Sequence, residues 1–102
     1  MDKVKEIIIN EKSVYLKRGE QNTYRILEIT YINDKRRFRT FAVEVENFKK
    51  IITKTERIDS FSNNLSETID FVNMLINKKT QASCIFDEAL SFLSLKINKL
   101  IA

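Results

Sequence analysis

The chain has 102 residues, of which 43% are hydrophobic and 31% charged, which predicts one globular domain and excludes a disordered chain. A single cysteine, Cys84, excludes an internal disulfide, and no stretch reaches the roughly 20 apolar residues of a membrane span. The N-terminal residues also lack the apolar core of a signal peptide. We therefore expect a cytoplasmic protein with no membrane partner.

The net charge of +4 is unevenly distributed. Residues 1–57 carry 14 Lys and Arg against nine Asp and Glu, whereas residues 58–102 carry four against five. A basic N-terminal half suggests a polyanionic partner, although a charge excess can also serve solubility alone.

The first half of the chain is rich in β-branched and aromatic residues, several of them alternating with polar ones, which predicts strands. Glycine and proline are scarce, so turns are inferred from polar clusters such as Asn33–Lys35. The predicted strands, in chain order, are Val4–Ile9, Ser13–Arg18, Thr23–Ile32 and Arg36–Val45.

Helical spacing begins near Glu46. From Phe48 to Ile58 the apolar residues recur every three or four positions, which predicts a helix. Two further helices are predicted over Leu65–Lys78 and about Gln81–Leu100. The last is apolar over more than half its circumference, which is typical of a central core helix or of one packed on a partner chain.

Strands followed by helices indicate an α+β fold with a four-stranded antiparallel sheet followed by a helix (ββββα) plus two C-terminal helices. We expect a single domain over residues 1–102. Within it, residues 1–58 form a basic ββββα unit and residues 59–102 a helical C-terminal extension. Three helices then compete to cover a sheet with two faces, so the sequence leaves open whether one face stays exposed.

The residue types needed for most catalysis are missing. The chain has no histidine, which removes the commonest general base and the commonest transition-metal ligand. Cys84 alone cannot build a Cys/His zinc site, and one glycine is too few for a phosphate-binding loop. We expect no catalytic residue, metal, cofactor or small-molecule substrate, and hence a protein that is not an enzyme.

Basic and aromatic side chains are interleaved on the predicted sheet. Proteins that bind single-stranded nucleic acid use this combination, because cations follow the backbone while aromatic rings stack on bases. The densest cluster lies at the second hairpin. The candidates by residue type are Lys12, Tyr15, Lys17, Arg18, Lys35, Arg36, Arg37 and Arg39.

Other interpretations of these residues remain open. The aromatic residues could form the core under the helices, which is the interpretation favoured for Tyr24 and Phe41, and the cations could be a solvated face. A basic hairpin can also protect an exposed sheet edge from pairing with another chain.

Two stretches resemble a repeat of the Pur-alpha family. Ile9–Lys17 resembles its Lys-x-aromatic-Tyr-Leu strand, and Gln21–Thr30 its polar turn and following aromatic-Leu-x-Ile strand. Arg37–Val43 and the segment around Phe48–Ile52 sit where that repeat has its fourth strand and helix. The resemblance covers about residues 7–58. The chain departs from the pattern at Thr23, where the family has glycine, and in the two helices that follow.

The resemblance implies a ββββα topology, binding of single-stranded DNA or RNA through the sheet, and a homodimer for a chain with one repeat. The positions that it implies for nucleic-acid binding are Asn10, Lys12, Tyr15, Lys17, Asn22 and Tyr24.

A protein-interaction module is the alternative function, such as a phage- or plasmid-encoded inhibitor or an assembly adaptor. Its basis is the apolar last helix, because such a face usually requires a partner, if only a second copy. The residues expected at that oligomer interface are Ile85, Phe86, Phe92, Leu93 and Ile97.

Overall fold

The computed structural model describes residues 2–101, with side chains described as far as Ile97. Four long strands are followed by two α-helices, with a short 3₁₀-helix, η1, leading directly into the second. The elements are β1 (Asp2–Lys17), β2 (Glu20–Asn33), β3 (Arg36–Lys49), β4 (Ile52–Ser62), α1 (Leu65–Lys78), η1 (Ala82–Cys84) and α2 (Ile85–Ile101).

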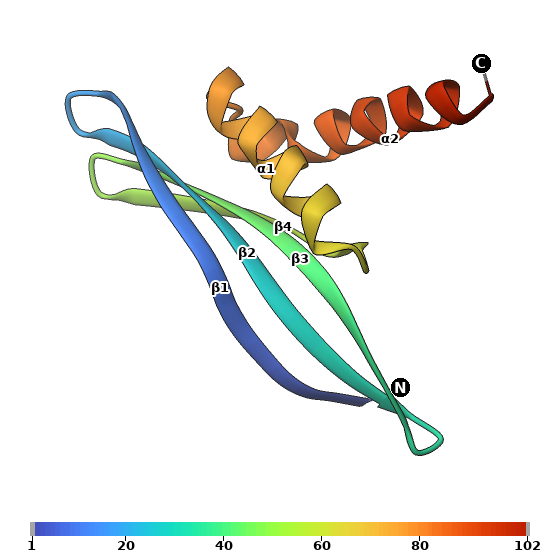
Figure 1. Ribbon diagram of the computed structural model, residues 1–102. Helices are drawn as coiled ribbons and strands as arrows, with labels where there is room; N and C mark the ends of the chain where they lie inside the picture. The colour runs from blue at the N-terminus through green and yellow to red at the C-terminus, as the bar shows by residue number, and fades with distance from the viewer. Residues whose placement is uncertain (1, 102) are drawn as a thin grey trace.

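The strands form one antiparallel sheet in the order β1-β2-β3-β4, so each strand pairs with its neighbour in sequence. Both helices lie on one side of this sheet, and the β2–β3 hairpin extends well beyond them (Figure 1). The predicted fold class, a four-stranded antiparallel sheet followed by helices, is confirmed. The hairpin loop expected at Asn33–Lys35 is also present, with positive φ angles at Asp34 and Lys35.

The helix predicted from Glu46 to Ile58 was wrong. This segment contains the end of β3, a turn at Lys50 and Ile51, and most of β4. The apparent helical spacing comes from two strands on either side of a turn that carries no glycine or proline. The structure has no helix at the position that the Pur-alpha resemblance assigned to one; the first helix begins at Leu65.

The two strands predicted at the N-terminus are one strand, β1. The polar residues around Glu11 do not form a turn, because β1 is an edge strand whose side chains are largely solvated and polar residues cost little there. A register shift between Ile8 and Asn10 accommodates the irregular pattern without interrupting the strand.

The sheet curls around the side that the helices leave uncovered, which we call the concave face. Arg57 on β4 forms an ion pair there with Glu6 on β1, although β2 and β3 lie between them. In a flat sheet, three strand spacings would separate β1 from β4 by roughly 14 Å. The two long side chains span part of this distance and curvature of the sheet the rest, and Leu27, Ile29 and Ala42 are buried on this face.

The opposite, helix-covered face carries the main core. Apolar residues of β2, β3 and β4 pack there against α1, η1 and the first turns of α2. At its centre Phe71 stacks on Phe61, with ring centroids 4.4 Å apart, and contacts Phe92 at 5.3 Å. These apolar contacts attach both helices to the same face of the sheet.

Helix α1 is capped at both ends. The side chain of Asn64 accepts a hydrogen bond from the Glu67 N–H (3.0 Å), and Lys79 closes the helix in the left-handed conformation with φ of 52°. Among the described residues, no helix is long and apolar enough to cross a membrane.

Candidate functional site

The centre of the concave face is occupied by ion pairs. Arg25 contacts Glu11 on β1 and two glutamates of β3, Glu46 at 3.1 Å and Glu44 at 3.9 Å. Partial burial acts to lower the pKa of Arg25, but hydrogen bonds to Glu11 and Glu46 and the charges of these glutamates raise it above its ordinary value. Because its charge is neutralised locally, Arg25 is a poor candidate for binding phosphate.

A second ion-pair cluster continues this pattern. Arg57 forms an ion pair with Glu6. Its Nε lies 2.9 Å from a carboxylate oxygen of Asp59, but the angle does not allow a hydrogen bond. This buried Nε therefore has no hydrogen-bond partner among the described residues. Acidic residues outnumber the two arginines in these clusters. The middle of the open face is therefore not the basic platform that the sequence suggested.

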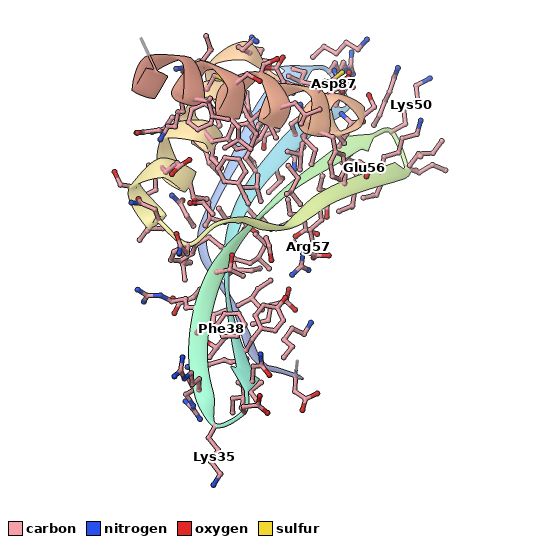
Figure 2. The ribbon with its side chains drawn as sticks, turned by 90° about the vertical axis from the view of Figure 1, so that its right-hand side faces the viewer. Lys35, Phe38, Lys50, Glu56, Arg57 and Asp87 are labelled. Atoms are coloured by element: carbon pink, nitrogen blue, oxygen red, sulfur yellow. The ribbon has the colours of Figure 1, made fainter. Side chains whose placement is uncertain are left out.

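The β2–β3 hairpin carries exposed cations instead. Lys35 lies at its tip and Phe38 on its shaft, far from the helices (Figure 2). The rings of Tyr31 and Phe38 stack with centroids 5.6 Å apart. All four predicted cations of the hairpin lie at this end and are exposed: Lys35, Arg36, Arg37 and Arg39.

Strand pairing distributes these groups over both sides of the hairpin. Arg39 lies over the ring of Phe41 at 5.6 Å and within 3.6 Å of Glu28, so it points to the helix-covered side. Tyr31 pairs directly with Phe38 and lies on the concave side. Because side chains alternate along β3, Arg37 shares the side of Arg39 and Arg36 shares the side of Phe38. A strand of nucleic acid on the concave side would therefore meet the aromatic pair together with Arg36, next to Lys35 at the tip.

The predicted residues of β1 and the first turn are exposed, but at the other end of the sheet. The side chain of Tyr15 is 79% exposed, and register places it in one row with Gln21 and Phe48 on the concave face. Lys17 lies 3.7 Å from Glu20, which partly neutralises it. Arg18 is exposed beside them, and Asn10 and Lys12 are exposed farther along β1, nearer the middle of the sheet.

The Pur-alpha resemblance implied that Asn22 and Tyr24 contact nucleic acid, but the structure buries them, with 0% and 1% of their surfaces exposed. The core position favoured for Tyr24 and Phe41 on residue type is confirmed. The Tyr24 hydroxyl donates to the carbonyl of Thr80 (3.0 Å), and Asn22 donates to the Tyr24 hydroxyl (3.0 Å). Burial raises the pKa of Tyr24, against the opposing effect of the hydrogen bond from Asn22. The loop between α1 and η1 covers both side chains, so they support the fold and are not available to a ligand.

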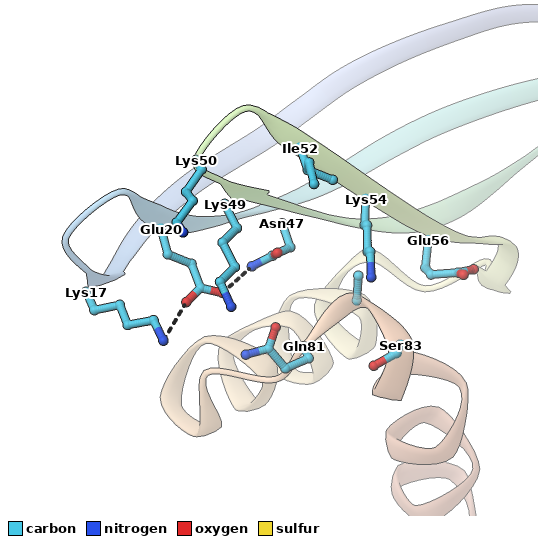
Figure 3. Close-up of a pocket in the computed structure, with 11 residues that line it drawn as sticks. Lys17, Glu20, Asn47, Lys49, Lys50, Ile52, Lys54, Glu56, Gln81 and Ser83 are labelled. Carbon is cyan, nitrogen blue, oxygen red and sulfur yellow. Dashed lines mark hydrogen bonds and ion pairs between the residues drawn. The ribbon is translucent and has the colours of Figure 1, made fainter.

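A cavity of about 710 Å³ lies where the two turns at one end of the sheet meet η1 (Figure 3). Four lysines line it: Lys17, Lys49, Lys50 and Lys54. We call it the lysine pocket. Sequence reasoning missed the last three lysines because the segment was predicted to be helical, which would have distributed them around a helix.

The residues expected at an oligomer interface divide into two groups. Ile85 is buried and Phe92 packs on the core, so neither is available to a partner. Phe86 and Ile97 are exposed and Leu93 is half-buried. With Leu90, they follow one face of α2, and a small apolar groove of about 250 Å³ lies between this face and β4.

No group of three or more His, Cys, Asp or Glu side chains in the described part of the chain could hold a metal ion. The one free thiol, Cys84, is exposed at the end of η1, directly before α2. No family model, curated protein or solved structure matches this chain.

Proposed function

We propose that this protein binds single-stranded nucleic acid through the β2–β3 hairpin. The observation that carries the proposal is the combination, on one protruding hairpin, of four exposed cations with the stacked pair of Tyr31 and Phe38. Cations that neutralise phosphates give salt-dependent affinity, and exposed rings add stacking with bases. The Pur-alpha resemblance supports the same ligand class, although it placed contacts on Asn22 and Tyr24, which are buried.

Fluorescence anisotropy with labelled single- and double-stranded oligonucleotides at several salt concentrations tests this proposal. The variant Arg36→Gln/Arg37→Gln removes two hairpin cations and should reduce the salt slope by about 1.4, because each phosphate contact on a single strand contributes about 0.7. The control, Lys78→Gln/Lys79→Gln, removes two charges from the exposed end of α1 and should bind like the parent.

Phe38→Ala separates stacking from charge. It should weaken single-strand binding by about tenfold or more, as expected for one lost stacked base, while leaving the salt slope unchanged. An absence of binding at low salt, or equal loss in the α1 control, would contradict the hairpin proposal.

A protein-interaction role is the second candidate, and the exposed face of α2 favours it. Phe86 and Leu90 are 50% and 66% exposed, one turn apart, beside the outer edge of β4. We propose a homodimer in which a second copy covers this face, because apolar helix faces beside an unpaired edge strand are common dimer contacts.

Two substitutions on the same helix test the dimer. Leu90→Glu places a charge on the face beside the groove, whereas Leu95→Glu places it about 140° around α2, at a leucine of similar exposure. Light scattering should show a monomer only for Leu90→Glu. A parent protein that is already monomeric at high concentration would exclude the dimer and leave the hairpin proposal intact.

A further inference from the structure

The lysine pocket is built from three separate segments that meet at the end of the sheet opposite the β2–β3 hairpin. The β3–β4 hairpin supplies Lys49, Lys50 and Lys54, the β1–β2 turn supplies Lys17, and η1 with the preceding residue closes the remaining side. Figure 3 shows Lys54 directed from β4 toward η1 and Lys17 approaching Glu20 from the opposite side. Cations from distant positions in the sequence therefore converge on one cavity.

The charge in this cavity is not balanced internally. Two carboxylates face the four lysines, those of Glu20 and Glu56. Glu20 is already held by Asn47 (3.1 Å) and lies 3.7 Å from Lys17. Among the ion pairs of the described side chains, this is the only one within the pocket. The charges of Lys49, Lys50 and Lys54 are therefore available to bind an anion in the pocket.

A network of hydrogen bonds holds the floor of the pocket. Asn47 donates to Asn22 (2.7 Å), whose amide in turn donates to the Tyr24 hydroxyl and the Thr80 carbonyl. The two turns are tied together by the Lys50 N–H, which donates to the carbonyl of Gly19 (2.8 Å). These bonds position the lysine backbones before any ligand binds, which reduces the entropy lost on binding.

Lys50 also occupies an unusual backbone conformation. Its φ of 58° lies in the left-handed region, where glycine is usual at a two-residue hairpin turn. A lysine at this position strains the turn and places a cation at the rim of the pocket. Lys79 has a similar φ of 52° but caps α1 and does not line the pocket, so it offers a matched control.

The lining favours recognition of charge over recognition of a nucleobase. Ile52 is the only large apolar side chain in it, and Gln81 and Ser83 add uncharged polar groups opposite the lysines. The volume of about 710 Å³ lies within the usual range for small-ligand sites. Lysine binds phosphate as a mobile point charge with three N–H donors, and several lysines around one cavity suit a ligand with several adjacent negative charges.

We infer that the lysine pocket binds a compact polyanion, a chain of two or more phosphoryl groups, as carried by a free nucleoside polyphosphate or by the 5′ end of a nucleic-acid strand. The pocket and the tip of the β2–β3 hairpin are separated by the 14 residues of β2, roughly 40 Å along the strand. The two sites are therefore distinct, and each can be disabled without touching the other.

Calorimetric titration of the full chain with inorganic tripolyphosphate, at low and at high salt, tests the inference. Lys50→Gly and Lys54→Gln should each weaken binding by about tenfold, the effect of one charge-assisted contact. Lys50→Gly should not lower the melting temperature, since glycine adopts the positive φ without strain. Lys79→Gly relieves the same strain outside the pocket and should bind tripolyphosphate like the parent.

A second titration distinguishes the two sources of the phosphate chain. In the Arg36→Gln/Arg37→Gln background, where the hairpin is weakened, the same oligonucleotide is compared with a 5′-triphosphate and with a 5′-hydroxyl. Tighter binding of the triphosphate form, lost on Lys50→Gly, assigns the pocket to strand ends. Equal binding of both forms, with ATP as tight as tripolyphosphate, assigns it to free nucleotides.

Two results would overturn the inference. One is no heat of binding with tripolyphosphate at low salt, and the other is equal weakening by Lys50→Gly and Lys79→Gly. Neither result bears on the hairpin, because oligonucleotide binding by the parent is measured separately. Conversely, tripolyphosphate binding that persists in the hairpin variant supports the pocket even where the nucleic-acid proposal fails.

Discussion

The two faces of the sheet are held by different forces. The helix-covered face is stabilised by interlocking aromatic and aliphatic side chains around Phe61, Phe71 and Phe92. The concave face buries a smaller apolar strip and is held across its width by arginines paired with glutamates from other strands. Ionic screening weakens partly exposed ion pairs but does not weaken apolar packing, so the curvature of the sheet should change more with salt than the attachment of the helices does.

The largest expected effect comes from the helix-covered face. Phe71→Ala removes a fully buried ring that contacts two others, and we expect it to lower the free energy of unfolding by about 3–5 kcal/mol. Denaturant titration measures this change. Leu90→Ala, at an exposed position of α2, serves as the control and should change stability by no more than about 0.5 kcal/mol. Similar losses in both variants would show that the helices do not rest on this core.

A smaller effect is expected on the concave face. Arg25→Met leaves three glutamates without their shared cation, and its side chain is only 17% exposed. We expect a loss of about 1–3 kcal/mol, less than for a fully buried pair because the glutamates remain partly solvated. Arg39→Met, at a largely exposed ion pair, should change stability by less than about 1 kcal/mol. The Arg25 effect should shrink as salt rises, and a loss independent of salt would assign it to packing.

The smallest expected loss of stability comes from the hydrogen bond that links β2 to the loop between α1 and η1. Tyr24→Phe removes the hydrogen bond that the hydroxyl donates to Thr80 and the one that it accepts from Asn22, and it should cost about 1 kcal/mol at neutral pH. Burial raises the pKa of Tyr24, so the unfolded chain loses this proton first as pH rises. The parent therefore loses stability above the ordinary tyrosine value of 10.0, and its advantage over Tyr24→Phe should narrow there. Unfolding curves from neutral to alkaline pH measure this, with exposed Tyr15→Phe as control. If the difference in unfolding free energy between the parent and Tyr24→Phe stayed constant with pH, the burial of the Tyr24 hydroxyl would be contradicted.

The sheet was predictable where side-chain alternation was strong. The β3 strand carries regular alternation, β2 is rich in β-branched and aromatic residues, and the loop between them is polar; the structure confirms both strands and the hairpin. The β3–β4 turn was not predictable by the usual signals, because Lys50 occupies a position where glycine would have marked it. Without a glycine to mark the turn, the residues on both sides of it were predicted as one helix.

The candidate site was only partly predictable for a related reason. Exposure of the four hairpin cations follows from their place at a loop, whereas the burial of Asn22 and Tyr24 depends on Thr80, which lies 56 residues or more away in sequence. Convergence of the pocket lysines likewise depends on how two turns and η1 meet. No local pattern records such long-range contacts.

The exposure of β1 has a consequence for the behaviour of concentrated solutions. Its outer edge presents unpaired backbone groups, and Ile7, Ile8 and Ile9 form an apolar run along it that is at least 38% exposed. Such a segment can template strand-to-strand aggregation unless charged neighbours interrupt it. Lys5 and Lys12 flank the run and act as gatekeepers, so their cations, which bind no ligand in either proposal, protect the sheet from adding a fifth strand from another molecule.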